Sequence, residues 1–185
     1  NEVVNGDIHT ANMKAAGLKD RDQSKKFIYA FLYGAGASKL GKVVGGSAGM
    51  GQNLITKFLT NMPKLKELRE NIIEASQKGT IIALDGRLLH IRADYASLNT
   101  LLQGAGAIIC KQWLVHIIER IRKSGVDAKL VASIHDEYQF EVAKKDIKEF
   151  GQITKDAMKE TEKTLNVRCP LDCEFKSGTT WSETH

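Results

Sequence analysis

The clearest pattern of apolar and polar positions lies in residues 20–34, where it predicts a helix. Asp20 is suited to cap the N-terminus, with Gln23 three residues later as in a capping box, and Gly34 is suited to end the helix. Apolar side chains cover one side of this helix: Phe27, Ile28, Phe31 and Leu32. Beside them, four residues recur at every fourth position and form one stripe along the helix. The stripe consists of Arg21, Lys25, Tyr29 and Tyr33.

Four further helices are predicted where apolar residues recur with helical spacing. Two cover residues 48–60 and residues 63 to about 79, with Pro63 in the first turn of the second. Their inward-facing residues are Leu54, Ile55, Phe58, Leu59, Leu65, Leu68, Ile72 and Ile73. Residues 94–123 predict a long, largely buried helix ended by Gly125, and residues 145–165 a charged amphipathic helix. The glycine-rich segment 34–46 follows a helix rather than a strand, so we predict flexible connections there and not a dinucleotide-binding loop.

Short apolar runs around turn residues predict two hairpins. Residues 81–84 and 87–91 flank Asp85-Gly86, a pair that favours a tight type I′ turn. Residues 130–134 predict a buried strand, and residues 138–142 alternate in polarity as a half-exposed strand does. A last strand is predicted at residues 168–175. The predicted fold class is therefore α+β, with mainly helical residues first and antiparallel strands later.

Composition bounds the class of protein without identifying it. A chain of 185 residues can bury a sizeable core as one or two domains. We find no signal peptide and no apolar run near the ~18 residues of a membrane span, so we expect no membrane partner and a cytoplasmic location. The net charge is +5, and residues 1–60 hold eight Lys and Arg against four Asp and Glu. This balance suits phosphate binding but does not establish it.

The three cysteines do not predict a metal site. They are Cys110, Cys169 and Cys173, an odd count that indicates reduced thiols in a cytoplasmic compartment. Cys169 and Cys173 are close in sequence, but no second Cys or His pair at zinc-finger spacing accompanies them. We therefore reject a zinc site.

Three groups of polar residues are candidates for chemistry, and each also fits an ordinary structural role. The stripe is about 18 Å long. Its two cations and two rings suit a nucleoside triphosphate, yet a solvated helix face has the same composition. Asn99 and Gln103 form an i, i+4 amide pair that also fits plain polar helix positions. The turn His135-Asp136-Glu137 fits an ordinary acidic turn, although two adjacent carboxylates repel unless a cation such as Mg²⁺ lies beside them.

The motif Arg-x-x-x-Lys-x-x-x-Tyr-x-x-x-Tyr-Gly at residues 21–34 resembles the fingers helix of family A DNA polymerases, the class of bacterial polymerase I. Its form with Tyr in third position, and the sequence FIYAFLYGAG, are most similar to replicative polymerases of short-tailed phages. Further motifs follow in family order: GDIHT (6–10), LDGR (84–87), LNTLLQGAGA (98–107), HDE (135–137) and the final residues 177–185. The resemblance covers Asp7 to His185, nearly the whole chain, and suggests that the natural C-terminus is present.

The resemblance implies a right-hand polymerase fold. Residues 1–80 would be a helical fingers subdomain with a truncated start, and residues 81–185 the C-terminal part of an antiparallel-sheet palm. It implies that His9, Arg21 and Lys25 bind the triphosphate and that Tyr29 lies beside the sugar. It assigns primer–template contacts to Tyr33, Asn99, Gln103 and His135. Amides at these positions suit the minor groove, where every Watson–Crick pair shows acceptors.

For catalysis, the resemblance makes Asp136 the ligand of Mg²⁺ and Glu137 its weaker acidic neighbour. The family holds two metal ions between two carboxylates on separate palm strands. The second carboxylate would lie upstream of Asp7, where Glu2 is the one acidic residue and stands too close to match. Because the chain also opens with Asn1 rather than Met, we expect a companion polypeptide or a missing N-terminal region to supply that part. We expect the chain alone to be inactive.

The leading hypothesis is therefore the C-terminal part of a DNA-directed DNA polymerase. Such an enzyme adds deoxynucleoside triphosphates (dNTPs) to a primer 3′-hydroxyl, directed by a template, in DNA replication. The alternative is a non-catalytic DNA-binding or interaction module derived from such a polymerase.

Overall fold

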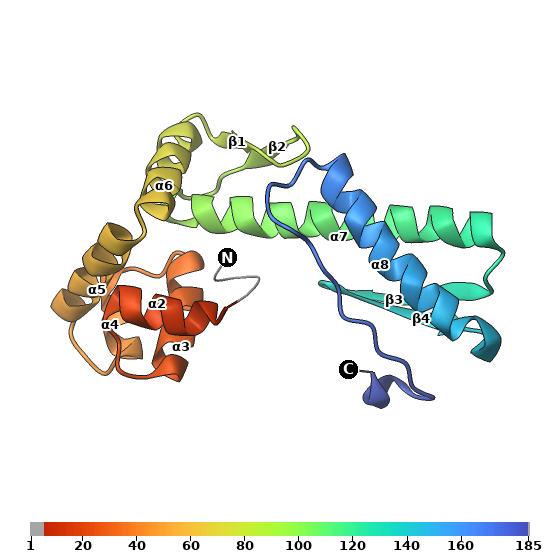
Figure 1. Ribbon diagram of the computed structural model, residues 1–185. Helices are drawn as coiled ribbons and strands as arrows, with labels where there is room; N and C mark the ends of the chain where they lie inside the picture. Colours follow the sequence, from red (N-terminus) through yellow and green to blue (C-terminus); the bar gives the residue numbers. More distant parts are fainter. Residues whose placement is uncertain (1–5, 185) are drawn as a thin grey trace. The chain divides into compact units, whose positions relative to one another are not determined.

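The computed structural model describes residues 6–184, which form two compact units. The first unit extends to Gln103 and the second begins at Gly104. Figure 1 labels the helices and strands along the chain. The helices are α2 (Ile8–Ala16), α3 (Arg21–Leu32), α4 (Ala37–Val43), α5 (Ala48–Asn61), α6 (Pro63–Ser76), α7 (Ser97–Ser124) and α8 (Ile147–Thr164). The strands are β1 (Thr80–Ile82), β2 (Leu88–His90), β3 (Ala128–Ile134) and β4 (Glu137–Val142). Three 3₁₀ turns complete the list: η1 (Asp94–Ala96), η2 (Lys144–Asp146) and η3 (Trp181–Glu183).

The core of the first unit is built around three aromatic rings. Phe27 and Phe31 of α3 are one helical turn apart, and Phe58 of α5 meets both edge-on, with ring centroids 5.6 and 5.4 Å away. All three are almost fully buried. Edge-to-face packing is the favoured geometry for such rings. The apolar side of α3 thus faces the core, as predicted, and the stripe faces outward.

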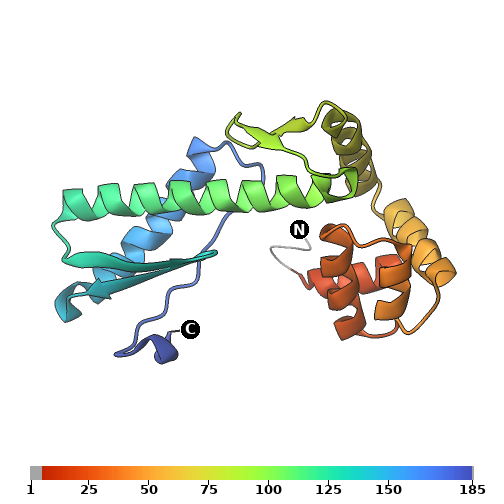
Figure 2. The ribbon, with the colours of Figure 1, turned by 180° about the vertical axis from the view of Figure 1, so that it is seen from behind.

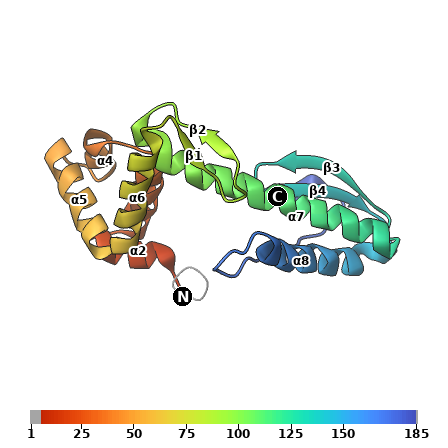
Figure 3. The ribbon, with the colours of Figure 1, turned by 90° about the horizontal axis from the view of Figure 1, so that it is seen from above.

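The predicted flexible connection after α3 is wrong, because residues 37–43 form helix α4, which packs closely on α5 (Figure 3). Two glycines allow this approach. A Cβ atom on Gly51 would lie 1.9 Å from the carbonyl oxygen of Ala37, and one on Gly41 would lie 2.0 Å from that of Ser47. Glycine lowers helix propensity, so tertiary packing outweighs the local signal here.

The hairpin between β1 and β2 is confirmed, but its turn is not type I′. That turn needs positive φ at both central residues, and Gly86 has φ 85° whereas Asp85 is not among the described residues with positive φ. Gly86 N donates to Ala83 O, and Ala83 N donates to Arg87 O, at 3.0 and 2.8 Å. These bonds describe a three-residue loop ending in a glycine bulge. Arg87 folds back onto Asp85, with Nη2 2.6 Å from Oδ2.

Helices α6 and α7 form close to the predicted bounds, with three differences. The prediction that the long helix is largely buried is wrong, because only 22% of its most apolar 18-residue stretch is buried. Leu68 of α6 is 38% exposed rather than inward, so only part of the predicted apolar face is covered. The predicted long helix begins as the 3₁₀ turn η1, and α7 itself starts at Ser97. Within residues 6–184, the stretch Asp94–Ser124 is the one long and apolar enough to cross a membrane by length and composition. That is weak evidence, because core helices of soluble proteins share these properties, and Trp113 and Ile117 are buried in the second unit.

The second unit packs α8 and the β3–β4 hairpin against the C-terminal part of α7 (Figure 2). Phe140 of β4 meets Phe150 of α8 with ring centroids 4.9 Å apart, and Trp113 Nε1 of α7 donates to Thr154 O of α8 at 2.9 Å. The prediction of a fully buried β3 is wrong. Val131 sits at a bulge between the pairs Leu130–Phe140 and Ala132–Gln139, and it is 67% exposed. A two-stranded hairpin covered on one face leaves its other face open.

No strand occupies residues 168–175 in the described structure, so the predicted last strand is also wrong. Instead Leu171, Cys173 and Phe175 pack side chains onto the second core. The backbone of Leu171 is held by α8: its N–H donates to Glu162 Oε2 at 2.8 Å, and its carbonyl accepts from Lys159 Nζ. An extended segment whose backbone bonds to side chains needs no neighbouring strand.

Candidate active site

The GDIHT segment forms the start of helix α2, which packs against α3 in the first unit. Asp7 is the N-cap of α2, and its carboxylate accepts from His9 N at 3.0 Å and from Thr10 Oγ1 at 2.8 Å. Aspartate is a preferred N-cap because it satisfies N–H groups that have no partner within the helix. The cap therefore fixes the first turn of α2, where the predicted site residue His9 lies.

The same carboxylate binds the predicted phosphate ligand Arg21 at the start of α3. Arg21 Nε lies 2.9 Å from Asp7 Oδ2, and Nη2 lies 3.3 Å from Oδ1, a two-point contact. The hydrogen bond from Arg21 holds the pKa of Asp7 well below its usual range, with Thr10 adding to the effect. Asp7 in turn raises the pKa of Arg21. Arg21 is thus anchored along one edge of its guanidinium group.

His9 lies close to the stripe. The buried Ser24 Oγ donates to His9 O at 3.1 Å, which ties the first turn of α2 to α3. The imidazole centroid is 6.3 Å from that of Tyr29, with the rings tilted by 54°. Within residues 6–184, His9 Nδ1 is buried and has no hydrogen-bond partner. A buried polar atom of this kind suits a ligand contact.

All four residues of the stripe are exposed: Arg21, Lys25, Tyr29 and Tyr33. Tyr29 and Tyr33 expose 48% and 55% of their surface although both are large aromatic residues. Asp20 is the N-cap of α3, as predicted, and its side chain accepts from Asp22 N. The predicted capping box, in which the cap would bond Gln23, is not the pattern observed. The structure thus presents two cations and two rings along one open helix face.

Gly34 ends α3 in the expected way. Its φ is 80°, and the bonds Gly34 N to Phe31 O and Ala35 N to Ala30 O, both 2.9 Å, form a Schellman motif. A Cβ atom at Gly34 would also lie 2.3 Å from the carbonyl oxygen of Tyr95, so a side chain would not fit. This close approach brings the end of the stripe next to the start of α7.

One of the two predicted amides meets the stripe. Gln103 Nε2 donates to the Tyr33 hydroxyl at 3.3 Å, and Gln103 is itself exposed. Asn99, one helical turn earlier on α7, is half-buried. Two of the residues predicted to contact primer–template therefore lie side by side in the first unit.

The acidic residues lie in the second unit, at the tight turn between β3 and β4. His135 has φ 53°, an uncommon conformation that places it and Asp136 at the tip, where both are exposed. Behind the turn, Trp113 of α7 packs on Tyr138 with ring centroids 5.4 Å apart. Burial raises the pKa of the nearby Cys110 thiol, and the negative charge of Asp136 adds to this.

Glu137 is held by a short relay of hydrogen bonds that the sequence did not predict. Gln139 Nε2 donates to Glu137 Oε1 at 2.5 Å, and Thr184 Oγ1 donates to Gln139 Oε1 at 3.3 Å. Thr184 directly follows η3, whose capping box joins Thr180 and Glu183. The C-terminal turn thus supports the side chain next to Asp136.

These residues and their order along the chain match a known family. The model of DNA polymerase family A matches residues 3–183. The chain belongs to DNA polymerase family A. The DNA-directed DNA polymerase of Enterobacteria phage T3 is 42% identical over 100% of this chain and 29% of its own length. The DNA-directed DNA polymerase of Escherichia phage T7 is 40% identical over 100% of this chain and 29% of its own length. DNA polymerase I of Geobacillus stearothermophilus is 26% identical over 93% of this chain and 20% of its own length.

A solved structure of the family shares the fold. The POL domain of Pol1 from M. smegmatis, in complex with DNA primer-template and dNTP, superposes with a TM-score of 0.77 at 20% identity. The match covers 84% of this chain and 31% of that one. The predicted family, its resemblance to phage polymerases and the predicted fold class are confirmed. The chain spans less than a third of the length of these curated relatives.

The side chains of the acidic turn are of the type that binds a hard cation such as Mg²⁺. Mg²⁺ prefers oxygen ligands and is usually held by one or two protein carboxylates together with substrate phosphates. Asp136 and Glu137 supply two adjacent carboxylates, one of them exposed at the tip of a fixed turn. Among the described residues, no group of three or more His, Cys, Asp or Glu could hold a metal by itself. Asp136 is therefore suited to bind a metal ion whose remaining ligands come from outside the described residues, such as substrate phosphates.

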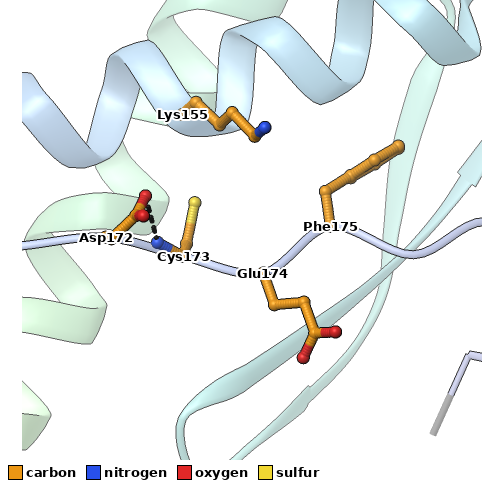
Figure 4. Close-up of a pocket in the computed structure, with 5 residues that line it drawn as sticks. All are labelled: Lys155, Asp172, Cys173, Glu174 and Phe175. Atoms are coloured by element: carbon orange, nitrogen blue, oxygen red, sulfur yellow. Dashed lines mark hydrogen bonds between the residues drawn. The ribbon is translucent and has the colours of Figure 1, made fainter. Parts of the chain in front are cut away.

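A shallow, open pocket of the second unit lies elsewhere. It is lined by five residues, whose side chains Figure 4 shows: Lys155, Asp172, Cys173, Glu174 and Phe175. Cys169 and Cys173 are free thiols, and burial raises the pKa of Cys173, which keeps it protonated and unreactive. This pocket contains none of the predicted site residues.

Beyond the relay at Glu137 and the Tyr33–Gln103 bond, two further features of the candidate site went unpredicted. Helix α2 was not expected, although Asp7 is a residue type preferred at helix N-caps and could have indicated its start. The pairing of Asp7 with Arg21 has no sequence signal, because 14 residues separate them. The roles of His9, Arg21, Lys25, Tyr29, Tyr33, Asn99, Gln103, His135, Asp136 and Glu137 stay predictions.

Proposed function

We propose that this chain is the C-terminal part of a DNA-directed DNA polymerase that adds dNTPs to a primer 3′-hydroxyl in DNA replication. It would act in the cytoplasm, or in that of the host if a phage encodes it. The observation that carries the proposal is the open stripe on α3, with His9 and Arg21 tied together at its N-terminal end, in a chain of DNA polymerase family A. The polymerases of phages T3 and T7 and the primer-template complex of M. smegmatis Pol1 support it.

In this proposal, residues 1–80 act as fingers and residues 81–185 as part of the palm. His9, Arg21 and Lys25 bind the triphosphate of the incoming nucleotide, and Tyr29 lies against its sugar. Their order along α3 matches a ligand with a charged end and a flat end. Tyr33, Asn99, Gln103 and His135 contact the primer–template. The Tyr33–Gln103 hydrogen bond supports a shared DNA-facing role for that pair.

Asp136 would hold Mg²⁺, with Glu137 as its acidic neighbour. Bound there, the metal supplies positive charge that stabilises the negative charge developing on the phosphates. Glu137 accepts a hydrogen bond from Gln139, which restricts the position of its carboxylate. His135 belongs to the same turn. Its backbone has a left-handed conformation, and this conformation determines the direction of its side chain. The protein's task at this turn is to orient these groups before substrate arrives.

We further propose that the second metal-binding carboxylate comes from a preceding region, on the same or a companion polypeptide. The small share of the phage relatives that this chain covers supports this. The test is magnesium-dependent primer extension by residues 1–185 alone, and again with the upstream region of the polymerase added. We expect extension in the second case only.

Robust extension by the 185-residue chain alone would show that the proposed division of the metal site is wrong. Specific primer–template binding in the complemented protein without extension would favour the alternative, a non-catalytic DNA-binding module. The control is Asp136→Asn, which should abolish extension while leaving DNA binding largely intact.

A further inference from the structure

Asp7 sits at the centre of the nucleotide end of the site and has four donors on its carboxylate. Oδ1 accepts from His9 N at 3.0 Å and from Arg21 Nη2 at 3.3 Å. Oδ2 accepts from Thr10 Oγ1 at 2.8 Å and from Arg21 Nε at 2.9 Å. A carboxylate offers about four acceptor positions, so this group is fully used.

Helix capping does not require the charge of this carboxylate. Asparagine and serine cap helices about as well as aspartate. The ion pair with Arg21 is also exposed, since 43% of the Asp7 side chain and 53% of the Arg21 side chain reach solvent. Exposed pairs stabilise folds little. What the negative charge adds is its hold on the Arg21 side chain.

The contact with Asp7 orients the guanidinium group of Arg21. A guanidinium group carries five N–H donors in a rigid planar fork. Asp7 engages the edge formed by Nε and Nη2, whereas Nη1 makes no hydrogen bond in the part of the chain that the structure describes. Fixing one edge of a rigid plane aims the opposite edge, which therefore stays available for an anion.

The same carboxylate also sets the spacing of Arg21 and His9. His9 lies in the helical turn that Asp7 caps, and Ser24 of α3 holds the His9 carbonyl from the other side. One acidic side chain thus joins the N-terminal ends of two helices. It places two proposed phosphate ligands in a fixed relation to each other.

We infer that Asp7 is a positioning residue for the nucleotide triphosphate, acting through the Arg21 side chain. The inference rests on the proposed function of the site. Because a carboxylate repels phosphate, Asp7 should not strengthen nucleotide binding. It orients Arg21 so that the guanidinium group meets the phosphates in the geometry that the transition state requires.

The test is Asp7→Asn in the complemented polymerase, measured as steady-state and single-turnover incorporation of one dNTP. Asparagine keeps the helix cap and removes the charge. We expect kcat to fall by about tenfold or more, with the KM for dNTP unchanged or lower. In an Arg21→Ala background, Asp7→Asn should cause no further loss, because the side chain through which it acts is gone.

Three results would overturn the inference: a kcat within twofold of the parent, a raised KM with kcat retained, or an equal further loss in the Arg21→Ala background. Circular dichroism and the melting temperature check folding, and Asp7→Ser, a second uncharged cap, replaces Asp7→Asn if that variant does not fold. The Lys25→Ala variant distinguishes a failure of the proposed role of Asp7 from a failure of the proposed nucleotide site. If Lys25→Ala impairs dNTP use and Asp7→Asn does not, only the role of Asp7 fails; if neither does, the nucleotide site itself is misplaced.

Discussion

Arg21 and Lys25 occupy the first turns of α3, where the helix dipole disfavours cations and favours anions. Arg21 is balanced by Asp7, but among the described residues Lys25 has no carboxylate within ion-pair distance. The N-terminal end of α3 therefore combines the helix dipole with a lysine that has no ion-pair partner among the described residues. Both favour an anionic ligand, which is the physical argument for the proposed nucleotide site at the level of single residues.

Lys25→Ala should reduce kcat/KM for dNTP in the complemented polymerase by about ten- to hundredfold. A charge-assisted contact to phosphate contributes about 1.5–3 kcal/mol. The affinity for primer–template should change little, since Lys25 is predicted to contact the nucleotide alone. The measurement compares nucleotide kinetics with DNA binding in the same preparation. The neighbouring Lys26→Ala is the matched control, because Lys26 is also exposed but lies outside the stripe. Equal effects of both variants would contradict the prediction.

Tyr29 should decide how the enzyme treats dideoxynucleotides. The family resemblance implies that Tyr29 lies beside the sugar, where a Phe would leave a space that the substrate 3′-hydroxyl fills. A site that depends on a substrate hydroxyl rejects the analogue lacking it, whereas the Tyr29 hydroxyl can replace that group. We expect near-equal use of dideoxynucleotides, and strong discrimination against them after Tyr29→Phe.

The ratio of kcat/KM for a dNTP and its dideoxy analogue, measured in both proteins, checks this. Tyr33→Phe is the control, because it removes a hydroxyl elsewhere on the stripe and should leave the ratio unchanged. Indistinguishable ratios for the parent and Tyr29→Phe would mean that Tyr29 does not face the sugar.

At the scale of elements, the contact between α4 and α5 depends on glycine and makes opposite predictions for two positions of one helix. A Cβ atom at Gly51 would overlap the backbone of Ala37, whereas at Gly49 the nearest atom outside its immediate neighbours is Ser47 Oγ at 3.6 Å. Gly51→Ala should destabilise the protein by about 1–3 kcal/mol, as overpacking does. Gly49→Ala should stabilise it by about 0.5–1 kcal/mol through helix propensity. Urea denaturation followed by circular dichroism measures both, and a shift of the same sign in both would refute the packing argument.

The sequence predicted those elements whose signal is local. The helices α3, α5, α6, α7 and α8 were predicted from apolar spacing with caps, prolines and terminal glycines. Helix α4 was missed because its glycines weaken the local signal and serve a contact with α5 instead. The segment 168–175 was predicted as a strand because its composition favours extended backbone, and composition does not show whether a second strand is available to pair with it.

The same limit applies to the candidate site. The exposed stripe on α3 was predictable, since periodicity alone decides which residues share a helix face. The pairs Asp7–Arg21 and Tyr33–Gln103 were not, because 14 and 70 residues separate their members. The motif resemblance predicts which residues bind the ligands, whereas the groups that hold those residues in place are visible only in the tertiary structure.

At the scale of the whole molecule, the described chain contains two separate apolar cores. The first includes Phe27, Phe31 and Phe58, and the second includes Trp113 and Ile117. Helix α7 contributes to both, with Leu98 in the first core and Trp113 in the second. Because packing within one core does not depend on side chains of the other, we expect the two units to respond separately to substitution.

Phe58→Ala tests this independence. Phe58 is 1% exposed and contacts two other rings, so its truncation should cost about 3–5 kcal/mol in the first unit. Amide hydrogen exchange of the 185-residue chain should show lost protection in α3 and α5 and unchanged protection in α8. Ile117→Ala, at a fully buried position of the second core, is the matched counterpart and should show the reverse pattern. If Phe58→Ala unfolds the first unit completely, Phe58→Leu gives a milder change at the same site. Equal loss of protection in both units, from either substitution, would mean that α7 couples the two cores into one cooperative unit.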